Sequence, residues 1–420
     1  MRMMQITLEN PAKSAGRRSK SRCGSLELDI IGTTGLVSPT KETLMGLLKG
    51  AVTFSRYRIM GALPDHFPDF FNERILRYAF QTVWRTTDEM AAGWTSLENC
   101  LDTDFAYASY AQGRYMLFSL RIDRKSVAPS LLRLRILEAE QKQLAESGQK
   151  KLYREQREAI RESVRLELLG KTLPVPSFHE ICWSVPDHVV TFCCLSDKVA
   201  GELQELFRES FSLGLSPYAP WDADGAGANT HGAASGSSSR DVALPPLPPG
   251  VDPLTVGREF LTWLWFKSEE RNGMIRIPGG SESEVVFVRR LVLEAGEGEY
   301  AETVVCQGLH ADLKEGKEAL RQGKKITAAR LRMAHDKAEW EFTFKADRFH
   351  FQSMKLPSVA ENDGEEADRE GQILERIYLI EKAAGMMDQL FRSFLDLRLS
   401  DGWGNEQTRL QKWIAQAKTD

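Results

Sequence analysis

The sequence predicts an α+β fold in which antiparallel meander sheets pack against helices and a helical hairpin protrudes from them. Two observations predict this class. Short runs of alternating apolar and polar residues recur along the chain, and segments with apolar residues three and four apart lie between them. One long segment of good helix formers predicts the hairpin. Hydrophobic residues make up 42% of the 420 residues and charged residues 27%, which indicates folded domains rather than a disordered chain.

The first α+β domain is expected over residues 45–221, after a disordered extension at 1–44. The extension has basic and small residues but no apolar core segment, so a secretory signal is not indicated. A misplaced start and a basic arm that holds phosphates are the alternatives. Strands are expected at 52–60, 94–97, 105–110 and 114–120, with a turn at Gly113, and as a pair within 178–195. Helices are expected at 64–78 and 197–211.

The hairpin is expected between Pro129 and Gly170. This segment is rich in Leu, Glu, Gln, Lys and Arg, and only Ser147 and Gly148 interrupt it. Gly170 is expected to end the second helix, because glycine commonly follows the last helical residue and Pro174 lies just beyond.

A flexible linker or insertion is expected at 222–252, where Gly, Ala, Ser and Asn give way to several prolines. A second α+β domain is expected over 253–420. Its strands are expected at 285–293, 301–307, 326–334, 338–345 and 348–355. Its helices are expected around 260–266 and at 311–322 and 371–399. One face of the last helix is expected to be buried: Ile373, Ile377, Ile380, Ala384, Met387 and Phe391.

The charge pattern of the second hairpin helix is the sharpest functional signal. The net charge of the chain is −4, yet residues 121–171 contain more basic than acidic side chains. Five cations, spaced by four, three, four and four residues, are predicted to form one stripe along the helix: Lys150, Arg154, Arg157, Arg161 and Arg165. Such a stripe suits a phosphate backbone. The alternative is a solvated helical face with intrahelical ion pairs, for example between Arg154 and Glu158.

A second basic group surrounds the end of the helix expected at 311–322: Lys314, Lys317, Arg321, Lys324 and Lys325. Cations at this end of a helix also complement the helix dipole, so a purely structural role is the alternative to ligand binding.

Catalytic motifs are weak in this sequence. No phosphate-binding loop, zinc-protease motif or nucleophile elbow occurs, and none of the six cysteines forms a C-x-x-C pair. Glu98, Asp102 and Asp104 form a carboxylate cluster that suits Mg²⁺, which leaves a magnesium-dependent exonuclease as an alternative. We expect a non-enzymatic protein without metal or cofactor. No apolar run is long enough to cross a membrane, and the cysteine usage fits a reducing cytoplasm.

Five segments in order resemble the recombination-associated RdgC family. The first is Gly93-Trp94, and the second is the run from Gly113 to Ser130 that leads into the charged hairpin. The third is Leu173-Pro174, followed by a Phe-rich strand pair and a helix. Phe260–Leu264 is similar to a Leu-Thr-x-Trp segment of that family, and Gly323–Thr327 to its Gly-Lys-Val-Val-Thr strand entry. The resemblance covers about Met45 to Asp401; the extension and the 222–250 insertion depart from it.

The resemblance implies a ring-shaped homodimer in the cytoplasm, associated with the nucleoid. RdgC proteins bind double-stranded DNA with little sequence preference, carry it through a ring with a basic inner wall, and restrain recombination driven by RecA. An acidic total charge is compatible with such a ring. A further alternative is a protein–protein adaptor that binds its partners through the hairpin. The candidate DNA-binding residues are Arg124, Lys125, Lys150, Lys151, Arg154, Arg157, Arg161, Arg165, Lys324 and Lys325.

Overall fold

The computed structural model describes residues 46–82, 87–220, 247, 252–276, 282–295, 302–308, 314–357 and 369–416. The expected extension at 1–44 lies outside these ranges, as does nearly all of the expected linker at 222–252. No helix within the described ranges is long and apolar enough to cross a membrane.

The described strands belong to one antiparallel sheet. In the first half of the chain they are β1 (Val52–Met60), β2 (Met90–Ser96), β3 (Ala111–Gln112), β4 (Tyr115–Arg124), β5 (Val175–Ser184), β6 (Val189–Phe192) and β7 (Gly214–Pro217). In the second half they are β8 (Met274–Arg276), β9 (Glu282–Glu294), β10 (Thr303–Gln307), β11 (Lys325–His335), β12 (Ala338–Lys345) and β13 (His350–Lys355). The order across the sheet is β10-β9-β11-β12-β13-β1-β6-β5-β4-β2, with β3 on β4, β7 on β1 and β8 on β9.

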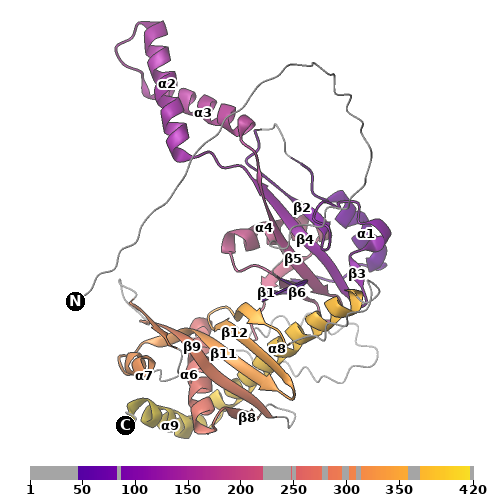
Figure 1. The fold of residues 1–420 in the computed structure, drawn as a ribbon, viewed down its shortest axis with the longest axis vertical. Coiled ribbons are helices and arrows are strands. Elements are labelled where there is room, and N and C mark those ends of the chain that lie inside the picture. The colour runs from indigo at the N-terminus through magenta and orange to yellow at the C-terminus, as the bar shows by residue number, and fades with distance from the viewer. Residues whose placement is uncertain are drawn as a thin grey trace, which may run out of the picture. The chain divides into compact units, whose positions relative to one another are not determined.

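Helices connect many of these strands along the chain, and the last two follow β13 (Figure 1). They are α1 (Phe67–Arg77), α2 (Pro129–Ser147), α3 (Arg154–Lys171), α4 (Asp197–Phe211), α6 (Pro253–Glu270), α7 (Lys314–Arg321), α8 (Arg369–Arg398) and α9 (Trp403–Ala415), with a short 3₁₀ helix, η1 (Ala106–Ala108). An α+β fold with an antiparallel sheet is therefore confirmed.

Several predicted boundaries are corrected by the structure. The strand expected at 105–110 is wrong, because Phe105 and Ala108 have positive φ angles of 48° and 52° and η1 occupies this segment. Asp102 accepts hydrogen bonds from the backbone N–H groups of Asp104 and Phe105, and such a turn competes with strand pairing. Gly170 does not end α3, which continues to Lys171.

The first core joins α1 and α4 to β1, β2, β4, β5 and β6. Its centre is aromatic: the Phe71 and Phe211 rings stack at 4.9 Å, and Trp94 meets Phe118 edge to face at 5.2 Å. The Trp94 indole N–H donates to Ser210 Oγ at 2.8 Å, so this buried ring keeps a hydrogen-bond partner.

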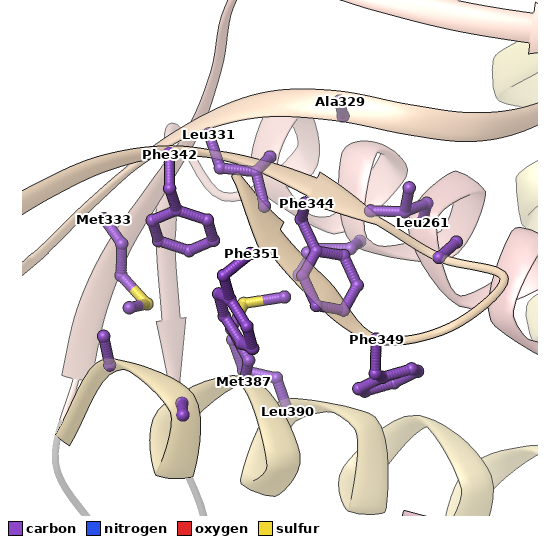
Figure 2. Packing of buried hydrophobic residues seen from close by; sticks show 14 of the residues in the cluster. Leu261, Ala329, Leu331, Met333, Phe342, Phe344, Phe349, Phe351, Met387 and Leu390 are labelled. Carbon is purple, nitrogen blue, oxygen red and sulfur yellow. The ribbon is translucent and has the colours of Figure 1, made fainter. Parts of the chain in front are cut away.

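The second core joins α6, α7, α8 and α9 to β9–β13. Alternate residues of β12 are buried in this core, as are Phe351 and Met354 of β13. Figure 2 shows Phe342 and Phe351 on the sheet side facing Met387 and Leu390 on α8. The six α8 residues expected to be buried are buried, which confirms the predicted face of that helix.

Strand β1 takes part in both cores. Its first residues pair with β13, where the rings of Phe54 and Phe351 stack at 4.7 Å, and Ser55–Arg58 pair with β6. Polar contacts from α8 reinforce this junction. Asp388 accepts two hydrogen bonds of 2.7 Å from Arg56, and Arg376 donates to backbone carbonyls of Gly46, Leu47 and Gly50.

Candidate functional site

The arginine row on α3 is formed by Arg154, Arg157, Arg161 and Arg165. The helix begins at Arg154, and the side chain of Gln156 accepts a hydrogen bond of 2.9 Å from the backbone N–H of Tyr153. Lys150 lies in the loop before the helix, so its predicted place on the helical stripe is wrong. The reason is Gly148, which ends α2 with a φ of 65° and starts a non-helical connection.

The two ends of the α3 row are engaged in ion pairs. The Nε of Arg154 lies 2.9 Å from Glu158 Oε1, and Arg165 pairs with Glu89. The Arg154 side chain is 90% exposed, and such a pair stabilises a helix by only about 0.3–0.5 kcal/mol. Arg157 and Arg161 are exposed and make no ion pair with other residues that the structure describes. The middle of the row therefore offers cations to a ligand.

The loop between α2 and α3 adds a basic hollow, which we call the tip hollow. Its volume is about 520 Å³, and its lining residues are Gln149, Lys150, Lys151, Leu152, Tyr153, Arg154 and Arg157. Leu152 is buried and anchors the loop, whereas Tyr153 is 73% exposed. Four of the lining residues are cations and none is a carboxylate, so the hollow is suited to an anion.

The remaining predicted contact residues are placed elsewhere. Arg124 forms an ion pair of 3.1 Å with Glu202, and Lys125 is only 6% exposed. Lys324 forms an ion pair of 3.0 Å with Glu302, and it lines with Lys325 a separate hollow beside Arg258. The structure therefore brings together the predicted contact residues of the hairpin. Arg124, Lys125, Lys324 and Lys325 do not line the tip hollow.

The carboxylate cluster at Glu98, Asp102 and Asp104 is not assembled into a metal site. Asp102 caps its own turn, and Glu98 lies 3.4 Å from Arg369. Across the described ranges, no three His, Cys, Asp or Glu side chains are placed to hold a metal ion.

One arrangement with the residue types of a catalytic triad was not apparent in the sequence. Ser283 Oγ lies 2.8 Å from His335 Nδ1, and the other ring nitrogen of His335 lies 3.3 Å from Asp336. Ser283 is only 1% exposed and its hydroxyl faces Met386, so a substrate has no access to it. We assign this group a structural role, in which it ties the start of β9 to the end of β11.

A second basic hollow, the sheet groove, was also missed. It has a volume of about 790 Å³ and contains six cations: Arg289, Arg290, Arg330, Lys345, Arg348 and Lys355. Its four carboxylates are Asp197, Glu294, Glu341 and Asp347. These cations are scattered over four strands and a turn, so no single segment of the sequence shows an excess of charge.

These features define a class: an α+β protein with an exposed row of arginines and two basic hollows. Neither a comparison with models of known protein families nor a search among curated proteins gives a match to the chain.

Proposed function

We propose that the chain is a non-enzymatic protein that binds double-stranded DNA without sequence preference. The tip hollow carries this proposal, because Lys150, Lys151, Arg154 and Arg157 line it without a carboxylate. The exposed Arg161 extends the same basic surface along α3. Arginine and lysine at this density suit the phosphates of a duplex, and contacts to phosphates carry no sequence information.

The resemblance extends the proposal to a homodimeric ring that modulates RecA-dependent recombination. Exposed apolar side chains on α2 support self-association: Leu131, Leu134 and Leu137 are 42%, 53% and 53% exposed. Groups of exposed apolar side chains often mark protein–protein contacts. Sedimentation of the free protein checks the dimer, which is the form that a ring requires.

The test reverses the two arginines of the α3 row that form no ion pair with the residues that the structure describes. We expect Arg157→Glu with Arg161→Glu to weaken binding of a fluorescent duplex at least about tenfold, because two phosphate contacts become repulsive. The plot of log affinity against log salt concentration should become less steep, with its slope smaller in magnitude by roughly two. The matched control is Lys337→Glu with Lys412→Glu, which changes the net charge equally at two exposed positions away from the hairpin.

Fluorescence anisotropy over a salt series measures both quantities, and circular dichroism checks that each variant is folded. Unrelated duplexes of equal length should bind alike. Equal affinity of the arginine variant and the control would contradict the α3 surface. An absence of DNA binding by the wild type at low salt would overturn the whole proposal.

A further inference from the structure

The sheet groove owes its shape to an irregularity in β9. Phe287 pairs with Leu331 and Leu291 pairs with Ala329, so three residues of β9 oppose Arg330 alone. Arg289 adopts a φ of 60°, a left-handed conformation that is strained for a residue other than glycine. The consequence is that Arg289 and Arg290 are both exposed, although neighbours in a regular strand alternate between faces.

A second irregularity lies on the opposite side of the groove. Ser353 in β13 has a φ of 51°, and its carbonyl oxygen accepts a hydrogen bond of 3.2 Å from Arg330 Nη1. Arg330 also donates to Glu341 at 3.0 Å, so its guanidinium is held in the floor of the groove rather than offered to solvent. Two departures from regular pairing therefore border one basic hollow.

The carboxylates of the groove are already matched by cations. Asp347 is held by Arg258 at 2.8 Å, and Glu294 lies 3.7 Å from the same guanidinium. Asp197 pairs with Arg348, and Glu341 pairs with Arg330. Arg289 and Lys355 lie only at 4.0 and 3.6 Å from Glu341. Arg290 and Lys345 form no ion pair with the residues that the structure describes. The groove therefore retains positive charge.

Two titratable groups respond to that charge. Burial acts to raise the pKa of Glu341, but the hydrogen bond and charge of Arg330, with Lys355 and Arg289, lower it below the usual value. Burial lowers the pKa of His350 to about 4, and Arg348 and Lys345 act in the same direction. His350 is therefore neutral at pH 7 and offers a hydrogen-bonding ring rather than another cation.

We propose that the sheet groove is a second contact surface for the sugar–phosphate backbone of DNA, separate from the tip hollow. This inference rests on the proposed function. Arg290 and Lys345 would hold phosphates, with Arg289 and Lys355 at the rim. The lining contains no Phe, Tyr or Trp, so bases have no platform on which to stack, and recognition of phosphates is the chemistry that remains.

The test uses Arg290→Glu with Lys345→Glu in the full chain, against the same Lys337→Glu and Lys412→Glu control. We expect duplex affinity at least about tenfold below that of the control and a salt slope smaller by roughly two. If the reversals disturb folding, Arg290→Gln with Lys345→Gln removes the two positive charges without adding negative ones. A loss of affinity smaller than that of the reversals is still expected, and the salt slope should again be smaller by roughly two, because the same two phosphate contacts are lost.

A labelling experiment locates the contact without any substitution. Lysines of the wild type are acetylated with and without duplex, and protection is read by mass spectrometry. Protection of Lys345 and Lys355, but not of Lys337, supports the groove. Normal DNA binding by the groove variants, with protection confined to Lys150 and Lys151, overturns the groove and leaves the proposed function intact. If the wild type does not bind DNA, the proposed function and the groove are both overturned.

Discussion

At the scale of single residues, Gly93 lies where two backbone segments approach so closely that a side chain does not fit. The backbone of β2 runs beside Ala79, where Phe80 N donates to Trp94 O and Trp94 N donates to Tyr78 O. A Cβ atom at position 93 would lie 2.3 Å from the Cα of Phe80, and a backbone atom cannot move aside as a side-chain end can. Glycine is thus required here by packing.

We expect Gly93→Ala to lower the free energy of unfolding by roughly 1–3 kcal/mol, the usual cost of overpacking. Gly170→Ala is the matched control, because a Cβ there has nothing within 4 Å and the residue lies in α3. The control should be neutral or stabilising by up to about 1 kcal/mol, since alanine favours helix. Urea denaturation of both variants measures the difference; equal stabilities would contradict the close approach.

At the scale of elements, the spacing of apolar residues predicted those features whose signal lies within one segment of the chain. Alternation located β12, and apolar spacing located the buried face of α8, because each signal lies within one segment. The β9 bulge has no such signal, since it depends on the register against β11. The sheet groove was missed for the same reason, whereas the arginine row was found because α3 alone displays it. Asp388 was also missed: nothing local relates it to Arg56, 332 residues away.

The pair of Arg56 and Asp388 connects β1 to α8 and is nearly enclosed, with side-chain exposures of 8% and 20%. Burial acts to lower the pKa of Arg56, but Asp388 outweighs it and raises that pKa, which keeps the guanidinium charged. We expect Asp388→Ala to cost about 3–5 kcal/mol of unfolding free energy, because it leaves a buried charge without its partner.

The control for this pair is Glu138→Ala, which removes an exposed ion pair with Arg135 and should cost less than about 1 kcal/mol. Guanidinium denaturation compares the two. Replacing both partners, as Arg56→Met with Asp388→Leu, should recover much of the loss. If Asp388→Ala costs no more than Glu138→Ala, the buried pair does not stabilise the junction.

At the scale of the whole molecule, the sequence predicted two α+β domains with a linker at 222–252, and no pattern in it relates β1 to β13. The structure shows one antiparallel sheet through both segments, with residues 44–420 forming one compact unit. Strand pairing between distant segments depends on matching edges and registers that composition does not encode. The two predicted segments consequently share β1, the Phe54–Phe351 stack and the polar contacts of α8.

Because both segments share β1, we can predict how the protein behaves when its chain is cleaved between them. With a protease site inserted after residue 235, we expect the two fragments to remain together after cleavage. The hydrogen bonds of β1 with β13, and those of Arg376 and Asp388 with the first segment, do not depend on the connection. Size-exclusion chromatography should give one peak containing both fragments, which separate only in denaturant. Asp388→Ala should make the cleaved protein separate at lower denaturant, because it weakens the junction and not either core alone. Separate elution of the fragments in native buffer would show that the shared strand does not hold the two halves together.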